Sequence, residues 1–381
     1  MKKQRVVAAM SGGVDSCVAA AMLLEQGYEV IGITMQLWNH GQDGNERFGS
    51  CCSLSDVHDA RIAAHRLGIP HYVVNYEKEF KKGVVDYFAS EYDAGRTPNP
   101  CVMCNSKLKF DHLADRAHAL GADMVATGHF ARVKHFDDGR PSQLFKGTDP
   151  KKDQSYFLFD VKPDYLKKAI FPLGELTKPE VRKIAAGMGI HTAEKSESQE
   201  ICFVSGRRYT DFLDQHYPEV TVHKGEIVDR DGNVLGLHDG IHMFTVGQRK
   251  GLGDIKSLEP KYVAAIDAKT NRVIVDDMEN LAVAGFEVAN TNWFDLEQDL
   301  PEDRVLSVMV RYRAPVVSCR VRKVGERKWM VILAEKARWV TPGQAAVFYD
   351  GDRVIGGGFI ATPEFADKPV QRAHAEVSAS L

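Results

Sequence analysis

The sequence has 381 residues, more than one typical domain, and its 44% hydrophobic and 27% charged residues are ordinary for a globular protein. Its net charge of −3 does not indicate a nucleic-acid partner, so local basic patches have to supply any attraction to phosphate. No apolar run is long enough to cross a bilayer, and the N-terminus lacks a secretory signal pattern, so we expect a cytoplasmic protein with no membrane partner. In a reducing compartment its seven cysteines point to catalytic, redox or metal roles.

The first element is an apolar stretch over residues 5–10, which predicts a buried strand. Residues 17–27 predict a helix that ends at Gly27, and Ser11–Ser16, with the sequence SGGVDS, joins the two. Backbone N–H groups and a helix dipole at such a turn hold phosphate oxygens. Because the turn has no lysine, it differs from the G-x-x-x-x-G-K-[ST] loop and resembles the PP-loop of ATP pyrophosphatases, which cleave ATP between the α and β phosphates. An ordinary glycine-containing turn is the competing interpretation.

Strands and helices alternate along the first half of the chain. Residues 30–35 and 71–75 predict strands, residues 55–67 a helix, and residues 124–129 the end of a further strand. This alternation predicts a parallel sheet with helices on both faces, and ligands bind such sheets at the carboxyl ends of the strands. Met35, Gly128 and His129 lie at such ends, although Met35 alone is better explained as a core residue and Gly128 alone as a turn residue.

An irregular loop in the stretch over residues 95–110 carries a C-x-x-C pair, Cys101 and Cys104, ahead of a helix expected over residues 108–120. A helix N-terminus and the nearby lysines Lys107 and Lys109 lower the pKa of a thiol. The pair is compatible with a zinc half-site, an iron–sulfur half-site or a redox pair, and the lack of a second C-x-x-C argues against a four-cysteine zinc site.

Further along, residues 151–158 predict a polar loop entering a strand, and residues 171–189 a mostly helical stretch with Thr177 as its cap and Pro179 in its first turn. A polar segment, residues 194–204, carries Cys202.

From residue 207 on, strand-like segments replace helices. Residues 262–267 and 272–275 predict a hairpin. Residues 305–313, 316–322, 329–333 and 345–349 predict strands of a small antiparallel barrel.

The predicted architecture is therefore α/β. A parallel-sheet PP-loop nucleotide-binding domain covers residues 1–206 and is followed by a small central β-rich domain over residues 207–280. A C-terminal antiparallel β-barrel covers residues 281–365, and a flexible tail covers residues 366–381.

Six motifs occur in order between Ala9 and Gly253: SGGVDS, TPNPxxxCN, ATGHFARV, KDQSYFL, SESQEICFV and VGQRKGLG. Together they resemble the tRNA-specific 2-thiouridylase family. The resemblance implies an N-terminal PP-loop domain, a small central domain and a C-terminal β-barrel. It also implies ATP-dependent 2-thiolation of the wobble uridine in tRNAs of the Lys, Glu and Gln type.

By this resemblance the enzyme adenylates the C2 oxygen of the uridine, so that AMP becomes the leaving group and Mg²⁺ neutralises the phosphates. The implied ATP-binding residues are Ala9, Met10, Ser11, Gly12, Gly13, Val14, Asp15, Ser16, Met35 and Gly128.

Sulfur transfer requires two cysteines. The resemblance implies that Cys202 carries a persulfide, that Cys104 is the nucleophile that completes the exchange, and that a Cys104–Cys202 disulfide remains and needs reduction. The sulfur would come from a persulfide donor, either a cysteine desulfurase or a sulfur-relay protein.

The implied tRNA contacts lie in both halves of the chain, where bases can stack on an aromatic ring and phosphates can pair with cations. They are Asn99, Pro100, Cys101, His129, Lys152, Asp153, Gln154, Arg311, Tyr312 and Gln344.

Cys101 departs from the family pattern, because many members have an Asp there that is a candidate general acid/base. Cys101 is then either an acid/base group itself, a tolerated substitution, or a ligand of a [4Fe–4S] cluster together with Cys104 and Cys202.

Three other functions compete with tRNA thiolation. They are another PP-loop AMP-forming ligase, such as an argininosuccinate or GMP synthetase type, a non-enzymatic tRNA-binding protein, and an iron–sulfur or redox carrier. Among the remaining cysteines, Cys17 and Cys319 are expected to pack in a helix and a strand, and Cys51 and Cys52 receive no role.

Overall fold

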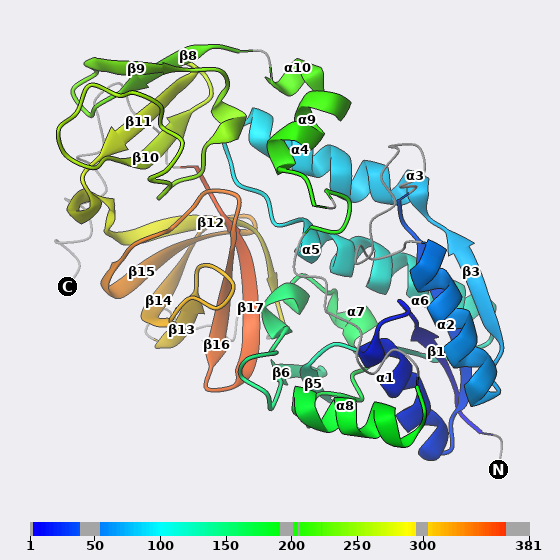
Figure 1. The fold of residues 1–381 in the computed structure, drawn as a ribbon. Coiled ribbons are helices and arrows are strands. Elements are labelled where there is room, and N and C mark those ends of the chain that lie inside the picture. Colours follow the sequence, from blue (N-terminus) through cyan, green and yellow to red (C-terminus); the bar gives the residue numbers. More distant parts are fainter. Residues whose placement is uncertain are drawn as a thin grey trace. The chain divides into compact units, whose positions relative to one another are not determined.

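The fold is that of a computed structural model, which describes residues 3–38, 54–190, 201–204, 206–221, 223–294 and 304–362 (Figure 1). The chain forms two compact units. The first comprises residues 1–85, 100–206 and 352–354, and the second comprises residues 86–99, 207–351 and 355–381. Residues 86–99 therefore belong with the second unit, although they precede much of the first in the sequence.

The first unit is built on a parallel sheet of five strands in the order β3-β2-β1-β4-β7. Its strands are β1 (Arg5–Ala9), β2 (Glu29–Gln36), β3 (His71–Asn75), β4 (Met124–Ala126) and β7 (Ala169–Ile170). The strand β1 is central, pairing Val6 with Val30 of β2 on one side and with Met124 of β4 on the other. The predicted parallel sheet is therefore confirmed.

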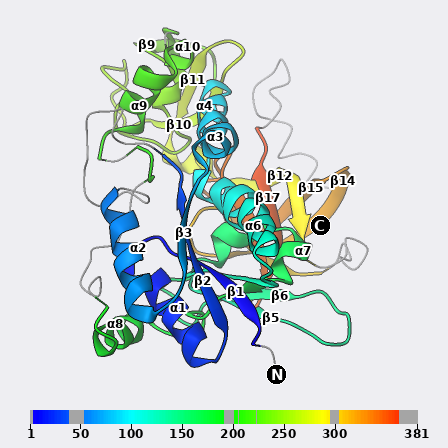
Figure 2. The same ribbon diagram turned by 90° about the vertical axis from the view of Figure 1, so that its right-hand side faces the viewer.

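Helices cover both faces of this sheet, as predicted (Figure 2). On one face α1 (Val14–Glu25) contacts β1 and β2, and it packs against α2 (Leu54–Leu67) and α8 (Lys178–Gly187). On the other face α6 (Leu113–Ala119) contacts β4.

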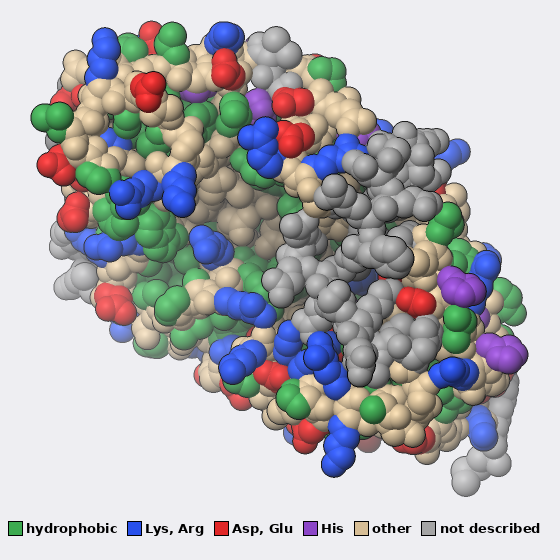
Figure 3. Space-filling model, viewed as in Figure 1, with side chains coloured by type: hydrophobic (Ala, Val, Ile, Leu, Met, Phe, Trp, Pro, Cys, Tyr) green, Lys and Arg blue, Asp and Glu red, His purple; other side chains and the backbone are tan. Residues whose placement is uncertain are grey.

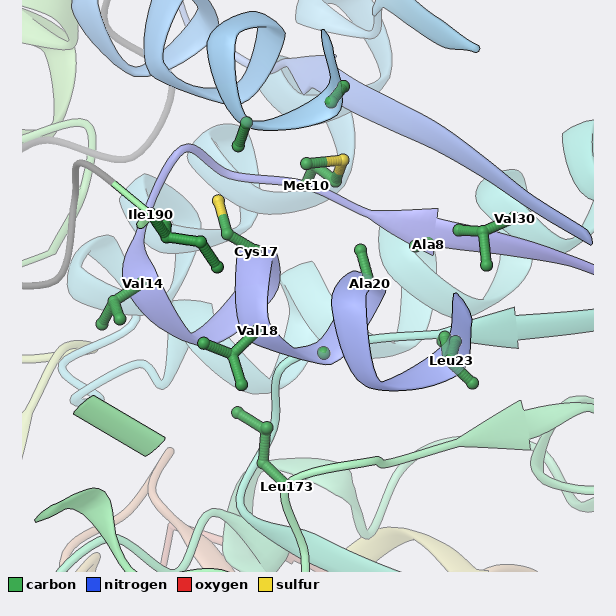
Figure 4. Close-up of a cluster of buried hydrophobic side chains, with 14 of the residues drawn as sticks. Ala8, Met10, Val14, Cys17, Val18, Ala20, Leu23, Val30, Leu173 and Ile190 are labelled. Carbon is green, nitrogen blue, oxygen red and sulfur yellow. The ribbon is translucent and has the colours of Figure 1, made fainter. Parts of the chain in front are cut away.

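The hydrophobic core of this unit surrounds α1 (Figure 4). Val18 points toward Leu173, while Cys17 and Ala20 lie on the opposite side of the helix, and Cys17 and Val18 are 0% exposed. An apolar helix packed on both sides fixes the turn at its N-terminus. The expectation that Cys17 packs in the first helix is confirmed.

One local prediction in this unit is wrong, and two others differ from the structure only in their bounds. Ser155–Leu158 is a 3₁₀ turn (η4), not the start of a strand, because the Asp153 side chain accepts hydrogen bonds from the backbone and hydroxyl of Ser155. The expected helix over residues 108–120 begins earlier, as α5 (Pro100–Met103), and continues as a π-helical segment η3 (Cys104–His112) before α6. The stretch 171–189 is helical only in α8, which starts at the predicted cap Thr177 with a capping box to Glu180.

The remaining elements of the first unit are α3 (Glu77–Phe80), the π-helical η2 (Lys81–Val85), α7 (Pro163–Leu166), and the antiparallel pair β5 (Ala131–Lys134) and β6 (Gln143–Lys146). Residues Arg353 and Val354 of β17 pair with β6.

The central part of the second unit contains a four-stranded sheet in the order β10-β11-β8-β9. Its strands are β8 (Gly225–Val228), β9 (Val234–His238), β10 (Tyr262–Asp267) and β11 (Arg272–Asp276), so the hairpin prediction is confirmed. Helices α4 (Asp86–Asp93), α9 (Tyr209–His216) and α10 (Pro218–Thr221) and the 3₁₀ turns η5 (Ile241–Met243) and η6 (Met278–Leu281) also belong to this unit. The sequence did not predict α9 because the stretch is short and its apolar positions are few.

The C-terminal part of the second unit is a closed antiparallel barrel of six strands, as predicted, because β12 pairs with both β15 and β17. Its strands are β12 (Val283–Trp293), β13 (Leu306–Met309), β14 (Val317–Gly325), β15 (Lys328–Ala337), β16 (Ala345–Asp350) and β17 (Arg353–Ile360). Cys319 lies in β14 and is 2% exposed, as expected, and burial raises the pKa of its thiol to about 12. No helix in the described part of the chain is both long and apolar enough to span a membrane.

Candidate nucleotide and sulfur-transfer site

The SGGVDS turn connects β1 to α1 and is stabilised by hydrogen bonds that its own serines make. Ser16 Oγ accepts a hydrogen bond from the backbone N–H of Ser11 at 3.1 Å and donates to the carbonyl oxygen of Gly13 at 3.0 Å. Gly13 is the N-cap residue of α1, and no side chain caps this helix. The N-terminus of α1 therefore lies at the turn, where its dipole favours an anionic ligand.

Two of the predicted nucleotide-binding glycines are required by packing. Gly12 has φ +75°, and a Cβ there would lie 2.1 Å from the carbonyl oxygen of Asp56. A Cβ on Gly128 would lie 2.8 Å from the backbone nitrogen of Ser16. The segment that follows β4 thus approaches the turn so closely that only glycine fits.

Met35 lies near the end of β2 and is 8% exposed, as expected of a core residue. The neighbouring Thr34 donates a hydrogen bond to the carbonyl oxygen of Met10 at 2.7 Å and lies 2.8 Å from Nε2 of His71. This bond ties the end of β2 to the residue before the SGGVDS turn. Contact of Met35 with adenine stays a prediction.

Lys178 is a functional candidate that the sequence did not reveal. Its Nζ lies 2.6 and 2.8 Å from the two carboxylate oxygens of Asp15, and its side chain is 8% exposed. It also lies over the ring of Phe130, 5.7 Å from the centroid. A nearly buried ammonium group at the SGGVDS turn supplies the cation that the motif itself lacks. Its only signal in the sequence is its place directly after the helix cap Thr177, 163 residues from Asp15.

The loop that carries the predicted tRNA residues Lys152, Asp153 and Gln154 is attached to the same region. The Asp149 carboxylate accepts from the backbone N–H of Lys178 at 3.0 Å and from that of Lys151 at 2.9 Å. Asp153 accepts from the backbone N–H of Gly147 at 2.9 Å, and its burial raises its pKa. Asp153 thus has a structural role, whereas Lys152 is half-buried.

A second attachment links Gln154 to the segment after β4. Gln154 Oε1 accepts from the backbone N–H of Phe130 at 2.9 Å, and the Gln154 N–H donates to the Phe130 carbonyl oxygen at 2.9 Å. His129 precedes Phe130, is 6% exposed, and lies 2.7 Å from the Thr127 hydroxyl through Nδ1. Burial lowers the pKa of His129 well below its usual value, so the ring is neutral at pH 7.

Basic side chains lie on this unit near the same loop. Figure 3 shows Lys and Arg side chains gathered over β5 and β6. Arg132 belongs to β5 and Lys146 to β6, and Lys151 and Lys152 follow in the next loop. A local group of this kind is the feature that any attraction to phosphate requires in a chain of negative net charge, and its contact with tRNA stays a prediction.

The cysteines Cys101 and Cys104 lie at consecutive helical segments of the first unit. Cys101, in α5, is exposed, and Cys104, the first residue of η3, is half-buried; both are thiols. Asn105, which follows, is 3% exposed and donates to the carbonyl oxygen of Phe157 at 3.2 Å. This bond anchors the start of η3 to the KDQSYFL motif.

The Cys202 segment packs near η3 through a shared helix. Phe203 contacts the ring of Phe80 in α3, with centroids 5.7 Å apart, and α3 in turn contacts η3, which starts at Cys104. Phe203 also lies 6.4 Å from the ring of Trp38. Two cysteine segments about 100 residues apart therefore lie against one helix of the same unit. Most of the polar segment ahead of Cys202, residues 191–200, lies outside the described residues, as do Cys51 and Cys52.

The structure gives no support to the alternative in which Cys101, Cys104 and Cys202 hold an iron–sulfur cluster. Cys101, Cys104 and Cys202 are all described, and within the described ranges no group of three His, Cys, Asp or Glu side chains is arranged to hold a metal ion.

The other predicted tRNA residues belong mainly to the second unit. Gln344 donates from its amide nitrogen to the carbonyl oxygens of Thr97 and Pro98, both at 3.0 Å. Asn99 is 7% exposed, and Pro100, at the start of α5 in the first unit, is buried. On the barrel Arg311 is exposed and Tyr312 is half-buried, with the guanidinium of Arg313 lying 5.1 Å from the Tyr312 ring centroid.

Comparison with known proteins gives one family for all parts of the chain. Residues 4–206 match the tRNA methyl transferase HUP domain, residues 210–277 the tRNA methyl transferase PRC-barrel domain, and residues 283–360 the aminomethyltransferase beta-barrel domain. The chain is 50% identical to the tRNA-specific 2-thiouridylase MnmA of Geotalea uraniireducens, over 94% of this chain and 95% of that protein. It is 48% identical to the MnmA of Geobacter metallireducens, over 94% and 97% of the two chains. It is 49% identical to the MnmA of Magnetococcus marinus, over 94% and 99%.

Proposed function

The chain belongs to the tRNA-specific 2-thiouridylase family, and from this we propose that it catalyses the ATP-dependent 2-thiolation of the wobble uridine of tRNA. The matched domain descriptions mention methyl transfer, but relatives that align over almost the whole chain carry the thiouridylase name. The observation that carries the proposal is that one compact unit holds both the SGGVDS turn and the two cysteine segments that share α3. Domain limits at residues 206, 280 and 365 are part of the same proposal.

In the first half-reaction the SGGVDS turn binds the phosphates of ATP. The N-terminus of α1 and the close approach at Gly12 and Gly128 support this role. Hard oxygen donors from Asp15 and the serine hydroxyls suit Mg²⁺, which would neutralise the phosphates. The Lys178 ammonium, now paired with Asp15, is placed to stabilise negative charge as pyrophosphate leaves. Attack by the C2 oxygen of uridine on the α phosphate then makes AMP the leaving group.

In the second half-reaction sulfur passes from Cys202 to the activated uridine. The terminal sulfur of a Cys202 persulfide attacks C2 and AMP departs. The Cys104 thiolate then attacks Cys202 Sγ, which forms a Cys104–Cys202 disulfide and releases 2-thiouridine. A persulfide donor protein reloads Cys202 after the disulfide is reduced. No step of this mechanism requires iron.

The tRNA would be held by both units. Lys152 and the basic side chains over β5 and β6 supply phosphate contacts in the first unit. Arg311 and Tyr312 supply a phosphate contact and a stacking surface on the barrel. Asn99 and Gln344 are further proposed tRNA contacts of the second unit, and Cys101 is one of the first. His129 supports the nucleotide segment from inside. A soluble enzyme acting on tRNA is expected in the cytoplasm.

The test uses iron-free full-length protein with ATP, Mg²⁺, a persulfide donor and unmodified tRNA, followed by nucleoside mass spectrometry. We expect 2-thiouridine and AMP in equal amounts. Cys104→Ser and Cys202→Ser should each abolish 2-thiouridine while tRNA binding survives, and Cys319→Ala, which removes a buried barrel thiol, is the matched control. Thiolation by either serine variant would refute the role given to that cysteine. AMP and 2-thiouridine both missing, with folded protein and intact tRNA, would refute the function.

A further inference from the structure

Cys101 and Cys104 share one face of a nearly continuous helix. α5 ends at Met103, which has φ −62° and ψ −40°, and η3 continues from Cys104, so the backbone stays helical across the pair. Side chains three residues apart on a helix have Cβ atoms about 5–6 Å apart. A disulfide needs about 3.5–4.5 Å between Cβ atoms, so a small local adjustment suffices to join the two.

Exposure separates the two thiols from other cysteines. Cys101 is exposed and Cys104 half-buried, whereas Cys17 and Cys319 are 0% and 2% exposed. Among the cysteines that the structure describes, Cys101 is the one with an exposed side chain. Thiol–disulfide exchange requires that the attacking thiolate reach the sulfur along the bond to be broken, so an external reductant meets Cys101 first.

Cys104 is also the residue that the proposed function leaves in a disulfide with Cys202. The Cys202 segment and η3 both pack on α3, so a disulfide between them would form inside one unit. A small dithiol has poor access to a bond between two half-buried sulfurs. A second thiol on the same helix face as Cys104 removes that obstacle.

We propose that Cys101 and Cys104 form a redox-active dithiol that takes over the disulfide left by thiolation and returns Cys202 to its thiol form. The Cys101 thiolate attacks Cys104 Sγ, a Cys101–Cys104 bond forms, and the Cys104–Cys202 bond breaks. Cys202 leaves with the electron pair and takes up a proton. An external dithiol then reduces the Cys101–Cys104 disulfide and is itself oxidised to a disulfide. The relay rests on the proposed function, but the dithiol itself does not.

The first experiment tests the dithiol without any thiolation. Full-length Cys202→Ser protein is equilibrated in glutathione buffers of graded redox potential, alkylated, and mapped by peptide mass spectrometry. We expect one intramolecular disulfide, between Cys101 and Cys104, and its loss in a Cys101→Ser/Cys202→Ser double variant. Separate glutathione adducts on Cys101 and Cys104 with no bond between them would overturn the proposal.

The second experiment follows turnover with dithiothreitol as the dithiol. After one turnover of persulfide-loaded wild type without reductant, we expect the Cys101–Cys104 disulfide and an alkylated Cys202. In Cys101→Ser the disulfide should instead join Cys104 and Cys202. At limiting dithiothreitol the ratio of the steady-state rate to the first-turnover burst should be at least about tenfold lower in this variant than in wild type, so that any effect of Cys101 on tRNA contact cancels.

The outcomes separate the relay from the function. If Cys101→Ser loses the burst while folded, Cys101 acts in the chemical step and the relay is wrong. Likewise, an unchanged steady-state rate in Cys101→Ser overturns it. If wild type makes no 2-thiouridine but Cys202→Ser still forms the Cys101–Cys104 bond, the proposed function fails and the dithiol stands.

Discussion

Lys178 takes part both in the backbone structure at the start of α8 and in the charge pairing at the SGGVDS turn. Its side chain is 8% exposed, its ammonium contacts both oxygens of Asp15, and its backbone N–H is bound by Asp149. A nearly buried cation of this kind is costly unless it stays paired. Because nucleotide phosphates offer a second set of anionic partners, the Asp15–Lys178 pair is suited to exchange partners when ATP binds.

We predict that Lys178→Met lowers kcat/KM for AMP formation at least about tenfold, which is about 1.4 kcal/mol of transition-state stabilisation. Methionine keeps the unbranched shape but removes the charge. The assay is tRNA-dependent release of AMP and pyrophosphate. Lys183→Met, on an exposed position of α8, is the control and should leave the rate unchanged. A normal rate in Lys178→Met would show that the pair is only structural.

His129 is a buried neutral group, and this has a consequence for stability. Its folded-state pKa lies well below 6.5 because burial, and next Lys109, disfavours the charged form. The unfolded chain therefore binds a proton at a higher pH than the folded one. The stabilisation is present above about pH 6.5 and is lost as the pH falls toward the folded pKa.

We predict that His129→Gln, which can still hydrogen-bond to Thr127 but cannot ionise, flattens the loss of stability between pH 6.5 and pH 5. The measurement is the urea midpoint of unfolding at several pH values. The difference between wild type and variant should shrink as the pH falls, since only the wild type has a histidine to protonate on unfolding. A constant difference over this range would contradict a buried neutral imidazole.

At the scale of elements, the loop from Gly147 to Ser155 is attached to the nucleotide site at two points. Asp149 binds the backbone N–H of Lys178 at the start of α8, and Gln154 exchanges hydrogen bonds with Phe130, two residues after Gly128. The loop carries Lys152, a predicted tRNA contact. We therefore expect a change on nucleotide binding at α8 or after β4 to reach this predicted tRNA-binding loop.

We predict that Asp149→Asn weakens the coupling between nucleotide and tRNA binding. In wild type a non-hydrolysable ATP analogue should tighten tRNA binding several-fold, a coupling of about 1 kcal/mol or more. The variant keeps the side-chain shape but loses the charge, so the factor should fall toward one. Fluorescence anisotropy with and without the analogue measures it, and Asp138→Asn, in an exposed ion pair, is the control. Equal coupling in the two variants would exclude Asp149.

Elements that depend on local sequence patterns could be predicted, whereas contacts between residues far apart in the sequence could not. Strands β1 to β4 and helices α1 and α2 follow from apolar periodicity and glycine stops, which are local signals. The helix cap at Thr177 was predicted for the same reason. The Lys178–Asp15 pair was not, because it joins residues 163 positions apart and no local pattern encodes it. The 3₁₀ turn after Asp153 was read as a strand because its aromatic residues favour strands, while the side chain of Asp153 decides the backbone.

At the scale of the whole molecule, basic side chains form local groups although the net charge is negative. The net charge is −3, yet basic side chains gather over β5 and β6 in the first unit, and Arg311 is exposed on the barrel of the second. A chain of negative net charge that binds a polyanion through local basic clusters is repelled by that polyanion elsewhere on its surface. Salt screens both the attraction and the repulsion. Salt dependence therefore tests whether the clusters contact phosphate.

We predict that log Kd for tRNA rises linearly with log salt concentration, with a slope that reflects several phosphate contacts despite the negative net charge. Arg311→Ala should lower that slope by about 1 if Arg311 pairs with a phosphate, and Lys152→Ala should do the same from the other unit. Arg320→Ala is the control, because Arg320 is exposed on β14 of the same barrel but is not a predicted contact. If both predicted variants weaken binding without changing the slope, they act on bases or on folding. If neither changes it, the phosphate-binding surface lies on other side chains, and the assignment of tRNA contacts to both units falls with it.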